Sequence, residues 1–225
     1  MKISLFLDKI IDFLKWPVVV YMIFCVPALL ASFRYFDPAN VKTISLFCGL
    51  IFFVFSKTMM DASVRTSMQV IAHELTHAFF ALITFHKVKN IRLNPDDTGG
   101  EMEFVGEENW LIVIAPYFFP IFIFVFIFIT FFLRQNIIFS VVLGYLLGYH
   151  LDTVASQIHD KQTDLPKVGY KFCFMFLPGA NLWIIGLILA YNAKGLSGFL
   201  KYVNFVNMLN IRFFYDVVEW LNNLF

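Results

Sequence analysis

The chain has 225 residues, of which 60% are hydrophobic, 15% are charged and 30 are phenylalanine. An ordinary soluble domain has roughly 45–50% apolar and about 25% charged residues, so this composition indicates an integral membrane protein. The formal net charge is +1, and such a balance gives no reason to expect a nucleic-acid partner. Cys25, Cys48 and Cys173 are isolated in apolar runs, which argues against a disulfide framework.

Five apolar runs are candidate membrane helices. Each run is bounded by charges or by Gly, Pro and Asn, and about 20 apolar residues are needed to cross the hydrocarbon core. Pro27 is expected to kink the first run. The runs cover residues 16–33, 43–56, 110–133, 136–151 and 171–192.

A sixth segment, residues 62–85, has apolar residues at helical spacing, but they are interrupted by His73, Glu74 and His77. Ionisable groups at membrane depth are costly unless they face protein, water or metal, so this cluster is a functional hypothesis. We expect an all-α polytopic membrane protein with about six membrane helices. Residues 1–225 form one domain in this interpretation, with a core over residues 62–192.

Two further segments differ from the apolar runs. Residues 88–105 contain two short extended pieces around Asn94–Gly100, which predicts a β-hairpin directly after the 62–85 helix. Residues 196–225 mix apolar and charged residues, which predicts an amphipathic tail at the membrane interface or one more span.

Residues 73–77 read His-Glu-Leu-Thr-His, and this segment predicts chemistry. His73 and His77 are four positions apart on a helix, so both imidazoles lie on one face and can bind one zinc ion. Glu74 lies beside that face, where it can polarise a zinc-bound water and pass the proton to a leaving amine. We therefore expect His73 and His77 as metal ligands, Zn2+ as the cofactor and Glu74 as the catalytic residue.

This motif in a hydrophobic helix, followed by a Gly-containing hairpin and further membrane helices, resembles the site-2 protease family of intramembrane zinc metalloproteases. The resemblance covers about residues 62–192 and implies cleavage of a peptide bond in a membrane-associated protein. It also implies that the hairpin holds substrate by strand addition. In that family the third zinc ligand is an aspartate on a later membrane helix, typically in a Leu-Asp-Gly sequence. The nearest counterpart here is Leu151-Asp152-Thr153, with threonine in place of the glycine.

Three residues are candidates for the third ligand. His150 ranks first, because a polar stripe that could orient it follows at helical offsets, formed by Thr153, Gln157 and Asp164. Asp152 is the alternative. Asp164 ranks below both, because residues 163–166 read Thr-Asp-Leu-Pro, which is typical of a helix start capped by aspartate.

Two other functions are compatible with the sequence. One is a non-catalytic membrane-embedded binding protein or chaperone, and the other is a zinc hydrolase acting on a lipid-like substrate, since the motif reports water activation and not the bond attacked. The expected partners are a membrane-protein or peptide substrate and membrane lipid, with no nucleic acid. The lack of paired cysteines and of a cleavable signal favours a bacterial inner membrane.

Overall fold

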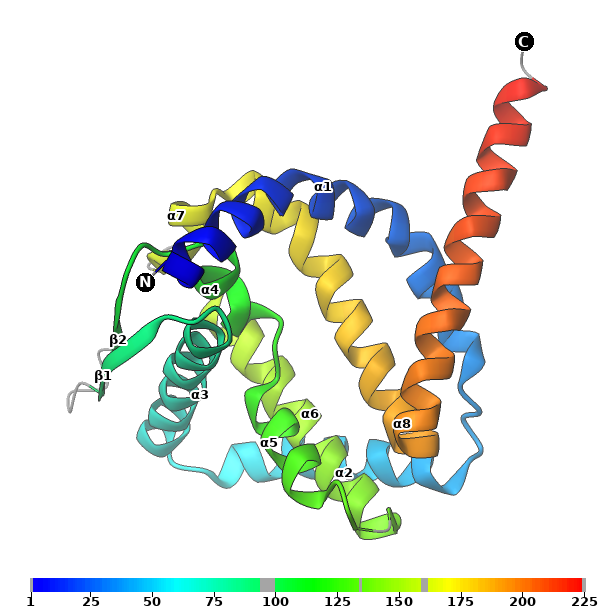
Figure 1. The fold of residues 1–225 in the computed structure, drawn as a ribbon. Helices are drawn as coiled ribbons and strands as arrows, with labels where there is room; N and C mark the ends of the chain where they lie inside the picture. Colours follow the sequence, from blue (N-terminus) through cyan, green and yellow to red (C-terminus); the bar gives the residue numbers. More distant parts are fainter. Residues whose placement is uncertain (1, 94–99, 134, 159–161, 224–225) are drawn as a thin grey trace.

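The chain folds into helices apart from one β-hairpin. A computed structural model describes residues 2–93, 100–133, 135–158 and 162–223. The elements in chain order are α1 (Lys2–Ser32), the 3-10 turn η1 (Phe33–Tyr35), α2 (Val41–Met59), α3 (Ala62–Ile83), β1 (Lys87–Leu93), β2 (Gly100–Val105), α4 (Trp110–Ile114), the 3-10 turn η2 (Ala115–Tyr117), α5 (Ile121–Thr130), α6 (Ile137–Gln157), α7 (Asp164–Val168) and α8 (Tyr170–Asn222). The expected helical class with one hairpin is confirmed (Figure 1).

Among the described helices, four are long and apolar enough to cross a membrane, namely α1, α2, α6 and α8. The expected continuous helix over residues 110–133 is wrong, because α4 with η2 meets α5 at an angle of 83°. Pro116 and Pro120 lie at this break, where each ring fixes φ and removes the N–H that a continuous helix needs. If the bent pair is one span the total is five, so the expected number of about six is not confirmed.

Helix α3 is not among these candidate spans, although it follows the expected segment 62–85 closely. It begins after Asp61, whose side chain accepts hydrogen bonds from the N–H groups of Ser63 and Val64. It ends at Ile83, and a positive φ of 61° at Phe85 turns the chain toward β1. The polar residues along α3 make it less apolar than its neighbours, and Gln69, His73, Glu74 and Thr76 among them are buried.

The hairpin packs against the end of α3. Strand β1 pairs antiparallel with β2, from Lys87 opposite Val105 to Leu93 opposite Gly100. Met102 and Phe104 of β2 contact a buried cluster that includes Phe80, Ala81, Ile112 and Ala115. The predicted hairpin is confirmed, while its turn, residues 94–99, lies outside the described residues.

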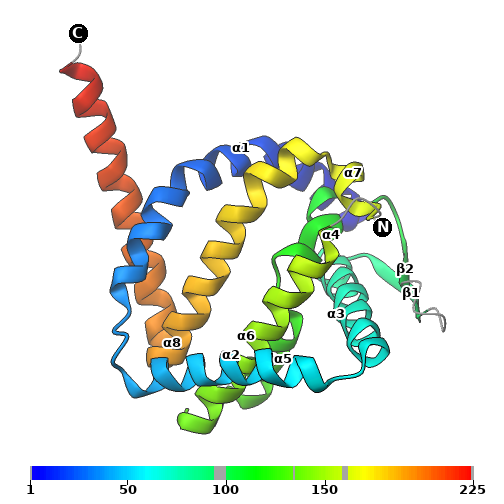
Figure 2. The same ribbon diagram turned by 180° about the vertical axis from the view of Figure 1, so that it is seen from behind.

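Helix α2 crosses α6 at very close range (Figures 1 and 2). Gly49 of α2 lies against the main chain of Val141, and Gly144 of α6 lies against the main-chain carbonyl of Leu46. A Cβ atom at position 144 would collide with that carbonyl, so only glycine allows the two backbones to meet. This crossing holds α6 beside α3, the helix that carries the histidines.

Helix α8 contains a sharp break at Lys194 and Gly195, whose φ angles are −142° and 60°. After the break the helix folds back along its own first part, as Figure 1 shows. Tyr202 is buried there, and its hydroxyl lies 2.7 Å from the Ser32 hydroxyl at the end of α1. The predicted tail is therefore the second half of α8, and its large exposed side chains include Phe214 and Trp220. Its expected position at a membrane interface stays a prediction.

We expect Gly144→Ala to separate α2 from α6 and to lower the free energy of unfolding by about 1–3 kcal/mol, the usual cost of overpacking. Denaturant titration of the detergent-solubilised protein measures this change. Ala155→Val adds bulk at an exposed position of the same helix and should have little effect. Equal stability of Gly144→Ala and the wild type would contradict the described crossing.

Candidate metal centre

Helix α3 presents His73 and His77 one turn apart, with their rings in edge-to-face contact. The two Nε2 atoms lie 3.0 Å apart, and the ring centroids lie 4.6 Å apart. His73 is buried, and His77 is partly buried at the edge of a cavity. The helical spacing therefore brings the two imidazoles together, as expected from positions i and i+4.

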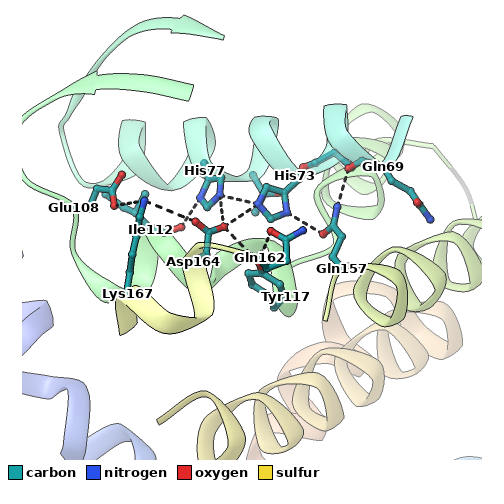
Figure 3. Close-up of polar contacts among 12 residues, drawn as sticks. Gln69, His73, His77, Glu108, Ile112, Tyr117, Gln157, Gln162, Asp164 and Lys167 are labelled. Atoms are coloured by element: carbon teal, nitrogen blue, oxygen red, sulfur yellow. Dashed lines mark hydrogen bonds and ion pairs between the residues drawn. The ribbon is translucent and has the colours of Figure 1, made fainter. Parts of the chain in front are cut away.

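Asp164, the first residue of α7, completes a cluster with the two histidines (Figure 3). Its Oδ2 atom lies 3.1 Å from Nε2 of His73 and 3.3 Å from Nε2 of His77. Within the described ranges, this is the one group of three or more His, Cys, Asp or Glu residues whose ligand atoms lie within metal-binding distance of one another, all inside 4.8 Å. Two imidazoles and one carboxylate are a donor set that suits a catalytic zinc ion.

The other ring nitrogen of each histidine is held by an oxygen atom. Nδ1 of His73 lies 2.9 Å from Oε1 of Gln157, and Nδ1 of His77 lies 2.8 Å from the carbonyl oxygen of Ile112. Nε2 of Gln157 donates to the carbonyl oxygen of Gln69 at 3.2 Å, which fixes the amide so that its oxygen faces His73. The Gln157 side-chain oxygen and the Ile112 carbonyl oxygen are both acceptors. The Nδ1 atom of each histidine must therefore carry a proton and donate it.

The Ile112 carbonyl is available for a reason visible in the sequence. In a continuous helix it would accept a hydrogen bond from the N–H of residue 116, but that residue is Pro116 and has no N–H. The proline that breaks the helix therefore leaves a buried acceptor pointing at His77.

With both Nδ1 atoms protonated, the two neutral imidazoles direct lone pairs on Nε2 toward each other and toward a carboxylate oxygen. Three electron-rich atoms within 3.0–3.3 Å of one another need a cation between them, either a proton or a metal ion. Burial would raise the pKa of Asp164, but hydrogen bonds from the two histidines, protonated when no metal is bound, hold it well below its ordinary value, and Asp164 in turn raises the pKa of His77 against the effect of burial. Asp164 is therefore a carboxylate, and the residues present fit a bound divalent metal.

Glu74 is buried beside the cluster and lines the same cavity as His73, His77 and Asp164. This cavity has a volume of about 780 Å³ and reaches β2. Burial raises the pKa of Glu74, which brings its carboxyl group closer to neutral pH, where it can exchange protons. A Cβ atom at Gly100 would lie 2.7 Å from Cγ of Glu74, so glycine at this strand position leaves room for the carboxylate side chain.

The geometry departs from the expectation that His150 completes the cluster. His150 lies on α6 and is buried, and its Nε2 atom has no hydrogen-bond partner among the described residues. It lines a separate small cavity together with His73 and Thr76, and it does not belong to the group formed by His73, His77 and Asp164. The polar stripe along α6 instead ends at Gln157, which orients His73, and the chain then continues to α7.

Asp152 is also outside the cluster. Its Oδ1 atom forms an ion pair with Nζ of Lys57, and its Oδ2 atom accepts a hydrogen bond of 3.1 Å from Nε2 of Gln69. Its charge is therefore used to join α2, α3 and α6. The sequence ranks Asp164 lowest because it predicts a helix cap at this residue, yet the N-cap residue of α7 is Thr163. The cap position thus lies one residue earlier, which leaves the Asp164 carboxylate free to face the histidines.

Sequence reasoning missed the Ile112 carbonyl and the phenol of Tyr117. The Tyr117 hydroxyl donates to Oδ2 of Asp164 at 3.4 Å, and its ring meets the His73 ring edge to face, 5.5 Å between centroids. Pro116, four residues after Ile112, indicates that the Ile112 carbonyl lacks its helical hydrogen bond. The direction in which this carbonyl points depends on how α4 packs against α3. A tyrosine in an apolar run carries no comparable signal.

Fold and site together define a helical membrane protein with a candidate metal centre of the peptidase type. The chain belongs to the Peptidase M50B-like family, the site-2 protease family, whose sequence model matches residues 44–157. No curated protein and no solved structure matches the chain. The matched range contains His73, Glu74 and His77, whereas Asp164 lies beyond its end.

Asp164 and His150, two of the three candidates for the third ligand, predict different behaviour of metal-binding variants. We expect Asp164→Asn to weaken zinc binding by more than about 100-fold, because it removes a ligand oxygen and its charge. This loss exceeds the one typical of a residue that only hydrogen-bonds to a ligand. His150→Gln should keep one zinc ion per chain. Chelator competition on the purified protein measures both affinities, and the opposite ranking would restore His150 as the ligand.

Proposed function

We propose that the protein is an intramembrane zinc protease that hydrolyses a peptide bond in a membrane-associated protein, with zinc held by His73, His77 and Asp164. The observation that carries the proposal is the convergence of two Nε2 lone pairs and a carboxylate while both Nδ1 protons are used elsewhere. Family membership supports a peptidase, and the four apolar helices support a membrane location. When bound, zinc would supply a Lewis acid that lowers the pKa of water toward neutrality.

Glu74 is the residue that moves protons in this proposal. Its carboxylate takes a proton from the attacking water and delivers it to the amine that leaves when the peptide bond breaks. Its place in the cavity that also contains the three ligand side chains supports this role.

The substrate in this proposal is an extended segment of a membrane protein. Gly100, Glu101, Met102 and Phe104 of β2 line the cavity beside Glu74, and a two-stranded sheet leaves the outer edge of each strand without a strand partner. An unwound peptide can pair with such an edge while its scissile bond faces the metal centre. A helical substrate keeps its backbone groups satisfied internally, so it must unwind before it can pair in this way. Membrane lipid and a bacterial inner membrane remain the proposed surroundings.

We expect Glu74→Gln to abolish turnover while it leaves the zinc content and the stability unchanged, because glutamine keeps the shape of the side chain but cannot accept the proton. Cleavage of fluorescently labelled single-span peptides in detergent micelles measures turnover, and metal analysis measures zinc. Glu107→Gln, an exposed carboxylate in the loop after β2, is the matched control and should keep full activity. Proteolysis retained in Glu74→Gln would remove the mechanism.

A further inference from the structure

A buried carboxylate in α1 lies at the junction of the two elements that hold His77. Asp8 is 8% exposed, and its Oδ1 atom accepts a hydrogen bond of 2.7 Å from Nδ2 of Asn109, which is fully buried. Its Oδ2 atom lies 3.2 Å from Nε2 of His86, three residues after the end of α3, in a contact that is not aligned as a hydrogen bond. A buried carboxylate is costly, so this arrangement calls for an explanation.

The Asn109 side chain connects Asp8 to the metal centre. While its Nδ2 donates to Asp8, its Oδ1 atom accepts the N–H of Ile112 at 3.1 Å and so caps the start of α4. The carbonyl of the same Ile112 accepts the Nδ1 proton of His77. Asp8 therefore fixes both the rotamer and the amide orientation of the residue that sets the position of the His77 acceptor.

Two further bonds tie α1 to the site elements. Nε1 of Trp110 donates to the carbonyl oxygen of Ile11 at 2.6 Å, and Nζ of Lys15 donates to the carbonyl oxygen of Val168 at 2.9 Å. Trp110 begins α4, and Val168 ends α7, the helix that begins with Asp164. One face of α1 thus contacts both α4, whose Ile112 carbonyl holds His77, and α7, which carries the Asp164 carboxylate.

We infer that Asp8 is a positioning residue for the metal centre, which it orders through Asn109 and the Ile112 carbonyl. The inference rests on the proposed zinc site and extends it to α1, which lies outside the residues matched by the family. Through these bonds the docking of α1 determines how tightly His77 and Asp164 hold the metal. Loss of the Asp8 charge should loosen the metal site more than it loosens the fold.

The test compares Asp8→Asn with Asp12→Asn, which removes the same charge from an exposed position on the same helix. We expect Asp8→Asn to weaken zinc binding about tenfold, the lower end of the range for partners that orient a ligand. The visible absorption bands of the cobalt(II)-substituted protein should also change, since they report ligand geometry. Asp12→Asn should match the wild type in both measurements.

A purely structural role gives a different result. In that case Asp8→Asn would lower the thermal stability of the metal-free and the zinc-loaded protein equally, with zinc affinity and cobalt spectrum unchanged, and the inference would be overturned.

If Asp8→Asn does not fold, Asn109→Ser decides, because serine keeps the helix cap but cannot reach Asp8. It should show the same loss of affinity, and an unchanged spectrum in that variant overturns the inference. A wild type without any cobalt spectrum would overturn the metal centre itself and the inference with it.

Discussion

Three electron-rich atoms held about 3 Å apart are the constraint around which this protein is arranged. Nε2 of His73, Nε2 of His77 and Oδ2 of Asp164 repel one another unless a cation lies between them. The fold nevertheless holds them together with hydrogen bonds on their far sides and with apolar packing behind them. An arrangement that is unfavourable without an ion and favourable with one is the physical basis of a preorganised metal site.

The support around this centre comes from two short helices and from the end of a long one. The break at Pro116 frees the Ile112 carbonyl, the end of α6 supplies Gln157, and the short helix α7 supplies Asp164. Each of these pieces is held by a regular element, because α1 bonds to α4 and α7 while the crossing of α2 fixes α6. The long helices therefore serve as the frame, and the short helices and helix ends between them carry these polar groups.

The proposed hydrolysis requires polar groups to gather in one place. The cavity beside Glu74 reaches β2 and is lined by charged side chains, whereas the outer faces of α1, α2 and the second half of α8 carry large apolar side chains. This division separates a polar surface from an apolar one within one small chain. It also accounts for the more polar character of α3, whose inner face belongs to the cavity and not to the hydrocarbon.

The sequence alone determined the membrane class, the hairpin, the family and the pair His73 and His77, because these depend on composition and on spacing along one element. Two histidines at i and i+4 meet whatever surrounds the helix. The third member of the cluster depended on tertiary structure, since α6 and α7 are separate elements and sequence offsets between them carry no geometric meaning. His150 and Asp164 would share one polar helix face only if a single helix continued from one to the other. Instead α6 ends at Gln157 and a new helix starts at Asp164. Only the packing of α7 against α4 and α1 directs that carboxylate toward the two histidines.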